Sequence, residues 1–219
     1  MVTHLGPYWI SRNEKVNQMI VTPWFELFEP ACKAIGMGYN GMKICELGNQ
    51  WMQVEGIKCG VGKEYFTSLG AEHVSIDLNG RAGALRLDLS KDILLEKPEW
   101  KGYFDLVSDI GTLEHVQDGV YEGFKNVHNF CRKGGVMIHS VPLSGHWYKH
   151  SPYHFQADFF KKLAAAAKYV CVLDELRTTT YGRHSRKPKT NTNAILVKEN
   201  DVPFISKEEF VSLGGIDVG

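Results

Sequence analysis

The chain alternates short apolar runs, each of strand length, with segments whose apolar residues recur at helical spacing. The strand-like runs cover residues 43–47, 73–78, 84–89, 104–110, 136–141, 169–173 and 193–197. The helical segments between them cover residues 63–69, 119–131 and 157–167. Apolar strands separated by helices are typical of a parallel sheet that is covered on both faces. The pattern therefore predicts an α/β fold that binds its ligand at the carboxyl ends of the strands.

Acidic residues mark the ends of four predicted strands. They are Glu46, which lies two residues before Gly48, and then Asp77, Asp88 and Asp109. A single acid at such a point is about as often the N-cap of the next helix as a ligand-binding group. Four in succession favour a ligand site, because carboxylates accept hydrogen bonds from a ribose diol or face an amine.

Length and charge restrict the class of protein further. A chain of 219 residues suits one domain with a continuous core, preceded by a helical N-terminal segment over residues 11–36 that Pro23 interrupts. We expect a helical cap over 1–41, the ligand-binding domain over 42–200 and a tail over 201–219. The 25 basic and 25 acidic residues balance, so neither a nucleic acid nor a membrane surface is favoured as a partner.

Cysteine usage and the N-terminal stretch point to one compartment. The five cysteines are scattered singly, as expected for a reduced protein, and residues 1–15 lack the pattern of a signal peptide. A cytoplasmic location is therefore expected. None of the nine histidines falls in a spacing such as HExxH, so the sequence predicts no metal site.

The turn after the first strand argues against a phosphate-bearing cofactor. A dinucleotide site needs GxGxxG, but only Gly48 is present in the run Gly48-Asn49-Gln50-Trp51-Met52-Gln53. A P-loop also fails, because Glu64 follows Gly62-Lys63 where a Ser or Thr is required. A ligand with a ribose and an amine but no phosphate fits this turn better.

Six segments together resemble the class I S-adenosylmethionine (SAM)-dependent methyltransferases, over about residues 42–198. They are KICELGNQ, HVSIDLNG, LRLDLS, YFDLVSDIGTLEHVQD, CRKGGVMIHSVP and HFQADFFKKLAAAA. The fourth is the closest match, since it resembles the family's FDLV followed by LEHV. The resemblance implies a Rossmann-like, doubly wound sheet of seven strands, mostly parallel, whose final strand near 193–197 is antiparallel.

The same resemblance implies a SAM site at the strand ends. Asp77 would bind the ribose hydroxyls, Asp88 would lie near the adenine amino group, and Gly48 would contact the methionine portion with Glu46 nearby. The remaining candidate cofactor-binding residues are Asn49, Leu78, Leu89, Asp109 and Ile110.

Two departures from the family pattern bear on this site. Asn49 and Gln50 stand where the family has further glycines. Glu46 precedes Asp77 by 31 positions, and we assign the excess to an inserted loop at 51–62. Asp77 and Asp88 are only 11 positions apart, too close for a full helix between two parallel strands. Either that helix is missing or Asp88 is not the adenine contact.

The segment after the fifth strand is the candidate acceptor site. Residues 145–154 hold His146, His150 and His154, any of which could act as a general base, with Trp147 and Tyr148 as pocket walls. The alternative is an ordinary aromatic loop. We interpret His115 as a structural or cofactor-side residue and His139 as a core histidine.

Two further segments could contact an acceptor. The basic residues of the connection between the last two strands could grip an anionic group, or could simply be solvated. They are Arg177, Arg183, Arg186, Lys187 and Lys189. Near the N-terminus, Tyr8 and Trp9 could stack on adenine or on the acceptor.

These observations lead to one preferred hypothesis and two alternatives. We expect a SAM-dependent methyltransferase that acts on a hydroxyl or amine of a small, sugar-like or anionic metabolite. The first alternative is a non-catalytic domain of the same fold that binds a nucleoside or a protein. The second, a nicotinamide-dependent oxidoreductase, is disfavoured by the missing glycines. The oligomeric state is left open.

Overall fold

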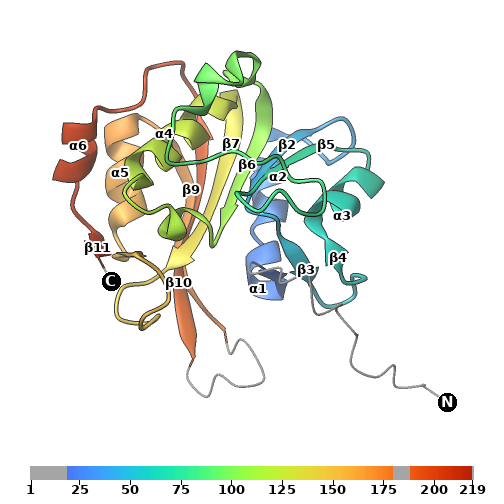
Figure 1. The fold of residues 1–219 in the computed structure, drawn as a ribbon, viewed down its shortest axis with the longest axis horizontal. Coiled ribbons are helices and arrows are strands. Elements are labelled where there is room, and N and C mark those ends of the chain that lie inside the picture. The colour runs from blue at the N-terminus through green and yellow to red at the C-terminus, as the bar shows by residue number, and fades with distance from the viewer. Residues whose placement is uncertain (1–18, 180–187, 219) are drawn as a thin grey trace.

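The computed structural model describes residues 19–179 and 188–218, and a six-stranded sheet forms its centre (Figure 1). In spatial order the strands are β5 (Glu72–Ile76), β2 (Lys43–Leu47), β6 (Phe104–Ile110), β7 (Cys131–Pro142), β10 (Lys189–Lys198) and β9 (Val170–Thr179). The first four are parallel, whereas β10 runs antiparallel to both of its neighbours. The prediction of a mostly parallel sheet with an antiparallel final strand is confirmed.

The sheet has six strands where seven were expected, and the missing strand is the one predicted over 84–89. This segment makes a single parallel bridge, between Leu85 and Ile76. Leu85 donates a backbone hydrogen bond to the Ser75 carbonyl, and Asp77 donates one to the Leu85 carbonyl. The few residues between the two segments are too short for a crossover helix, so the chain turns back tightly instead.

Helices cover both faces of the sheet because its strand residues alternate between two hydrophobic clusters. One face packs against α4 (Val120–Phe130) and α5 (Phe159–Ala167), with Phe210 of α6 (Lys207–Ser212) beside them. The other face packs against α2 (Phe28–Ile35) and α3 (Gly62–Ser68). Figure 1 shows these two groups on opposite sides of the sheet, with α1 (Thr22–Phe25) beside the second group.

A second, three-stranded sheet corrects two details of the sequence interpretation. It pairs β1 (Met19–Val21) with β3 (Trp51–Gln53), and β3 with β4 (Gly60–Val61). Residues 51–62, predicted as a loop, thus supply two strands. Residues 19–21, predicted as helical, are a strand, because Ile20 and Val21 are β-branched and Pro23 stands where a new helix begins.

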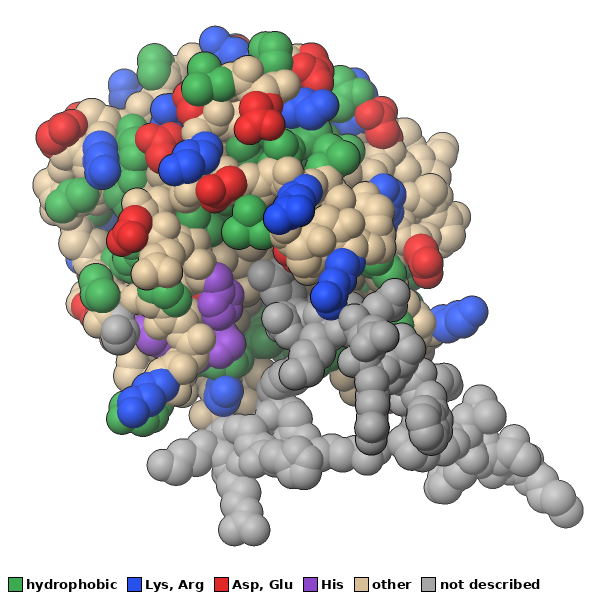
Figure 2. Space-filling model, viewed as in Figure 1, with side chains coloured by type: hydrophobic (Ala, Val, Ile, Leu, Met, Phe, Trp, Pro, Cys, Tyr) green, Lys and Arg blue, Asp and Glu red, His purple; other side chains and the backbone are tan. Residues whose placement is uncertain are grey.

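The remaining elements are short. A two-stranded sheet joins β8 (Tyr153–Phe155) to β11 (Ile216–Val218), and three 3-10 turns, η1 (Ile93–Leu95), η2 (Pro98–Trp100) and η3 (Leu113–His115), follow strand ends or loops. Across residues 19–179 and 188–218, the helices are all too short or too polar to cross a bilayer. Acidic and basic side chains are interspersed over the face drawn in Figure 2, where the histidines gather in one area.

His128 on α4 is a buried histidine held in its neutral form. Its Nδ1 lies 2.7 Å from the Tyr169 hydroxyl, and its Nε2 lies 2.9 Å from the Val202 carbonyl, which can only accept. Nε2 therefore carries the proton. Burial, followed by the nearby Lys198 ammonium, lowers the pKa of His128 from 6.5 to about 4.

This lowered pKa predicts an acid-dependent loss of stability. The unfolded chain binds the His128 proton more readily, so the stability is fully present above pH 6.5 and is lost as the pH falls through about 4. Between pH 7 and pH 4.5 we expect His128 alone to lower the free energy of unfolding by about 2 kcal/mol. Urea unfolding of wild type and His128→Gln at both pH values measures this. An unchanged pH dependence in His128→Gln would contradict it.

Candidate active site

The first part of the site is a cavity of about 370 Å³ at the carboxyl ends of β2, β5 and β6. It contains five of the nine residues predicted to bind the cofactor: Gly48, Asp77, Leu78, Asp88 and Leu89. The other lining residues are Ile76, Leu87, Ser90, Thr112, His115, Val116 and Gln117. The structure therefore brings the ends of three predicted strands together, as a parallel sheet requires.

Gly48 and Asp77 form the wall nearest to β2 and β5. Gly48 has a φ of 79°, which favours glycine, and its amide donates to the Ile76 carbonyl at 2.7 Å. The Asp77 carboxylate accepts one hydrogen bond from the Asn49 amide at 3.0 Å and another from the Asn79 amide at 2.9 Å. Each oxygen keeps a further lone pair, so the carboxylate is fixed in place and can still accept from a diol.

Asp88 also lines the cavity, in the tight turn that replaces the missing strand. Its Oδ1 accepts a hydrogen bond from the Ser90 amide at 2.9 Å, which lowers the pKa of Asp88. The short spacing allowed two alternatives: a missing helix, or an Asp88 that does not contact adenine. The structure shows that the helix is missing. Asp88 lines the cavity, and its contact with adenine stays a prediction.

Four predicted cofactor residues lie outside this cavity. Glu46 is buried behind it, where Oε1 accepts from the Gln50 amide at 3.2 Å. Asp109 is also buried, and it accepts from the Thr112 and Leu113 amides at 3.2 and 3.0 Å. Asn49 contributes its amide to Asp77, and Ile110 lines a second cavity.

Asp109 also anchors His139, which the sequence interpretation placed in the core. The two side chains are buried, with His139 Nδ1 3.0 Å from Asp109 Oδ2. Gln50, at a position where the family has glycine, donates through Nε2 to the Ile110 carbonyl at 2.8 Å and to the Leu47 carbonyl at 3.2 Å. It therefore ties the end of β2 to the end of β6, a role that no sequence pattern indicated.

The second cavity is smaller, about 70 Å³, and lies beside the first. Its lining residues are Met19, Trp24, Ile110, Gly111, Glu114, His115, Pro142, Trp147, His150 and Asn191. His115 lines both cavities, so the two meet at this side chain. A more open hollow of about 600 Å³ shares His150 with the smaller cavity and extends past Asp118, Lys149 and Tyr153.

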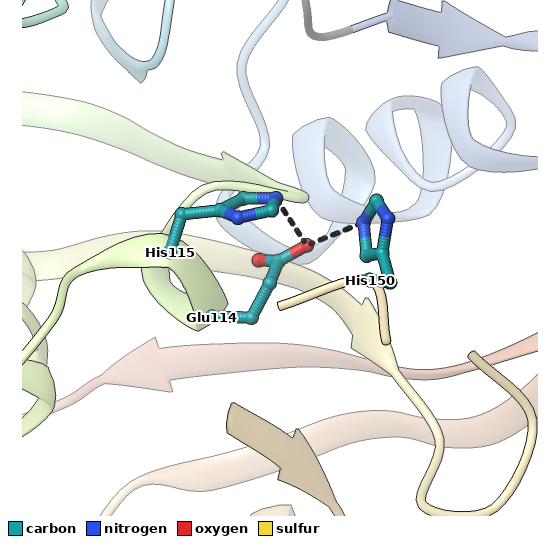
Figure 3. Close-up of side chains that lie close together, drawn as sticks. All are labelled: Glu114, His115 and His150. Carbon is teal, nitrogen blue, oxygen red and sulfur yellow. Dashed lines mark ion pairs between the residues drawn. The ribbon is translucent and has the colours of Figure 1, made fainter. Parts of the chain in front are cut away.

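Glu114, His115 and His150 converge at the boundary between these spaces (Figure 3). Glu114 Oε1 lies 3.8 Å from His115 Nε2 and 3.9 Å from His150 Nε2, although His150 follows His115 by 35 positions. Burial and the charge of Asp109 raise the pKa of Glu114 well above its usual range. Burial also lowers the pKa of both histidines, to about 4 for His150, whose neighbours His115 and Lys189 add to the effect.

The three histidines predicted as bases are placed differently. His150 faces the smaller cavity, and its ring packs on Trp147 with centroids 4.6 Å apart. His154 is buried, and its Nε2 lies 2.8 Å from the Trp147 carbonyl, so it holds the loop. His146 is exposed. Neither His146 nor His154 is among the described residues that line the two cavities.

The surrounding aromatic and basic residues are only partly as expected. Trp147 is a cavity wall, and its Nε1 donates to the Thr190 carbonyl at 2.8 Å, whereas Tyr148 is 87% exposed and lines neither cavity. Lys189 lies over the Trp147 ring at 4.2 Å, and Arg177 pairs with Glu26 at 3.4 Å. The predictions on Tyr8, Trp9, Arg183, Arg186 and Lys187 fall outside the described residues.

Comparison with known proteins supports the architecture. The chain matches no protein-family model and no curated protein by sequence. By structure it is similar to the Burkholderia thailandensis 1,6-didemethyltoxoflavin-N1-methyltransferase, which was solved with 1,6-didemethyltoxoflavin and S-adenosylhomocysteine (SAH). The identity is 15% and the TM-score is 0.51, and the similarity covers 76% of this chain and 75% of that chain.

A second similar structure is a SAM-dependent methyltransferase from Archaeoglobus fulgidus. Here the identity is 11% and the TM-score is 0.50, with 78% of this chain and 93% of that chain covered. Both similarities cover about three quarters of this chain, whose helices and strands alternate in a mixed α/β order. The protein therefore has the fold of the class I SAM-dependent methyltransferases.

Proposed function

We propose that the protein transfers a methyl group from SAM to a hydroxyl or amine of a small-molecule acceptor. The observation that carries this proposal is the pair of cavities that meet at His115. The larger one presents carboxylates for a nucleoside, and the smaller one presents a polar cluster for a reacting group. Of the two similar structures, the Burkholderia enzyme holds SAH and a small-molecule substrate, in keeping with such an arrangement.

The larger cavity fits the chemistry of SAM. Asp77 offers a fixed carboxylate for the ribose hydroxyls, and Gly48 leaves room for the methionine portion. No glycine-rich turn is present to cradle a pyrophosphate, and SAM has none. When bound, SAM would supply an activated methyl group on a sulfonium sulfur.

The smaller cavity would hold the acceptor's reacting atom. The acceptor lone pair would form the new bond to the methyl carbon while the carbon–sulfur bond breaks. The electron pair of the broken bond would stay on sulfur. The acceptor proton passes to a base, for which His150 is our candidate because it faces this cavity. Holding the reacting atoms in line is the larger contribution expected of the site.

The open hollow next to His150 would hold the rest of the acceptor. Lys149 borders this hollow, and Lys189 lies over Trp147, which lines the smaller cavity, so an anionic or sugar-like metabolite is our proposed substrate class. We also propose a cytoplasmic location, since all five cysteines are free thiols and two of them, Cys59 and Cys171, are exposed.

Isothermal titration with SAM, SAH and NAD tests the cofactor assignment. We expect one SAM or SAH to bind per chain and no heat of binding with NAD, because the turn after β2 lacks the glycines that a pyrophosphate needs. Binding of NAD in preference to SAH would contradict the proposal. Binding of SAH with no methyl transfer to any acceptor would favour a non-catalytic domain of the same fold.

A further inference from the structure

We propose that Glu114, His115 and His150 form a binding site for a divalent transition-metal ion at the boundary of the two cavities. The ligand atoms would be Glu114 Oε1 and the Nε2 atoms of both histidines, which all lie within 4.8 Å of one another (Figure 3). Metal binding itself does not depend on the methyltransferase assignment. The role of the metal toward the acceptor, argued below, rests on the proposed function.

The spacing of the three ligand atoms fits a shared ion better than direct hydrogen bonds. The separations of 3.8 and 3.9 Å from Glu114 Oε1 to the two imidazoles are too long for hydrogen bonds. Ligands bound to a tetrahedral ion at 2.0–2.2 Å lie roughly 3.4 Å apart. Because all three ligand atoms lie within 4.8 Å of one another, each side chain would need to move inward by about half an ångström at most.

The buried carboxylate lacks a compensating charge. The Glu114 side chain is 2% exposed, and among the described residues its ion pairs are only with His115 and His150. Its second oxygen, Oε2, is buried and has no hydrogen-bond partner within the described parts of the chain. A buried, unpaired carboxylate is costly, and a metal cation at the site would remove that cost.

Both backbone segments that carry the ligands are anchored. The turn that carries Glu114 and His115 is held by Asp109, which accepts from the Thr112 and Leu113 amides. The loop that carries His150 is held through Trp147, whose indole donates to Thr190 and whose carbonyl contacts His154. Metal sites depend on such support, because it holds the ligands in their binding geometry.

The donor set indicates the class of metal. Two imidazoles and one carboxylate suit Zn²⁺ and similar transition ions, whereas Mg²⁺ prefers oxygen ligands. Three protein ligands leave a fourth position open, and all three side chains line the smaller cavity. The signal is hard to find in the sequence because His150 comes 35 positions after the adjacent pair.

A metal here would change how the acceptor loses its proton. An acceptor hydroxyl bound at the open position would have a lowered pKa, as water has on zinc, so its proton would pass to solvent and the metal-bound oxygen would attack the methyl carbon. His150 would then hold the metal and would not accept the proton. Chelation separates the two roles, since it abolishes turnover only if the metal is required.

The test is titration of the chelator-dialysed protein with ZnCl₂, with MgCl₂ for comparison. We expect one Zn²⁺ per chain, and at least about 100-fold weaker binding in Glu114→Gln, His115→Ala and His150→Ala. His146→Ala, on the same loop but at a position that lines neither cavity, is the matched control and should bind like wild type. Thermal melts identify any variant that fails to fold. If an alanine variant does not fold, the Zn²⁺ affinity of Glu114→Gln, which keeps the shape of the side chain, provides the test.

SAH titration on the same samples keeps the two proposals distinguishable. Binding of Zn²⁺ without SAH would support the metal site and contradict the proposed function. Binding of SAH without Zn²⁺, or equal Zn²⁺ binding by Glu114→Gln and wild type, would overturn the metal site alone. Substitution with Co²⁺ gives a second readout, because imidazole ligation changes its visible absorption and the ligand variants should lose that change.

Discussion

In protein freed of metal by chelation, replacing His150 with Ala is expected to lower the rate of methyl transfer by about 10²- to 10⁴-fold, the usual contribution of a general base. Among the described residues that line the smaller cavity, His150 is the only one of the three predicted bases. Its lowered pKa of about 4 leaves the ring neutral at neutral pH, which is the form that a general base must have. The measurement is release of SAH with a panel of small hydroxyl and amine acceptors.

His146→Ala is the matched control for this experiment, since His146 lies on the same loop and is exposed. It should keep turnover close to that of wild type. His150→Ala should also keep its affinity for SAH, because His150 does not line the larger cavity. Full turnover in His150→Ala would mean that catalysis depends on positioning alone.

Removing the Asp77 carboxylate should weaken SAH binding at least tenfold. Each hydrogen bond to a charged group contributes about 1.5–3 kcal/mol, and a diol would make up to two of them with Asp77. Titration calorimetry of Asp77→Ala measures the loss. Asp77→Asn separates the charge from the shape, because the amide oxygen can still accept one of the two backbone hydrogen bonds that the carboxylate now accepts.

A change at the other end of the same strand controls for damage to the sheet. Glu72 begins β5, is exposed, and accepts a hydrogen bond from the Tyr103 hydroxyl at 2.6 Å, away from the cavity. Glu72→Gln should bind SAH like wild type. A folded Asp77→Ala variant with wild-type affinity would exclude the ribose role of Asp77.

The central sheet was predictable because strands that are buried on both faces consist mostly of consecutive apolar residues. The runs at 43–47 and 104–110 coincide with β2 and β6, since each strand is apolar over most of its length. The small sheet was not predictable in the same way. Its strands have two or three residues, too few to show any period, and β1 pairs with β3 across about 30 positions.

The same difference applies to the site. Gly48, Asp77 and Asp88 lie at or just after the ends of predicted strands, so the rule that parallel strands end at one edge places them together. Glu114, His115 and His150 come together only because the segment after β7 folds back over the turn after β6. That closure depends on the Trp147 contact with Thr190, 43 positions away, and on the His154 contact with the Trp147 carbonyl, neither of which a periodic pattern encodes.

The tight turn over residues 77–88 has an evolutionary consequence. It forms one wall of the larger cavity, yet Leu85 joins it to the sheet through only two backbone hydrogen bonds. Residues 78–83 between these points are nearly all exposed. Insertions, deletions and substitutions there would reshape the wall while leaving the six paired strands intact. In a lineage of such proteins, this turn is the place where ligand preference can diverge at the least cost to folding.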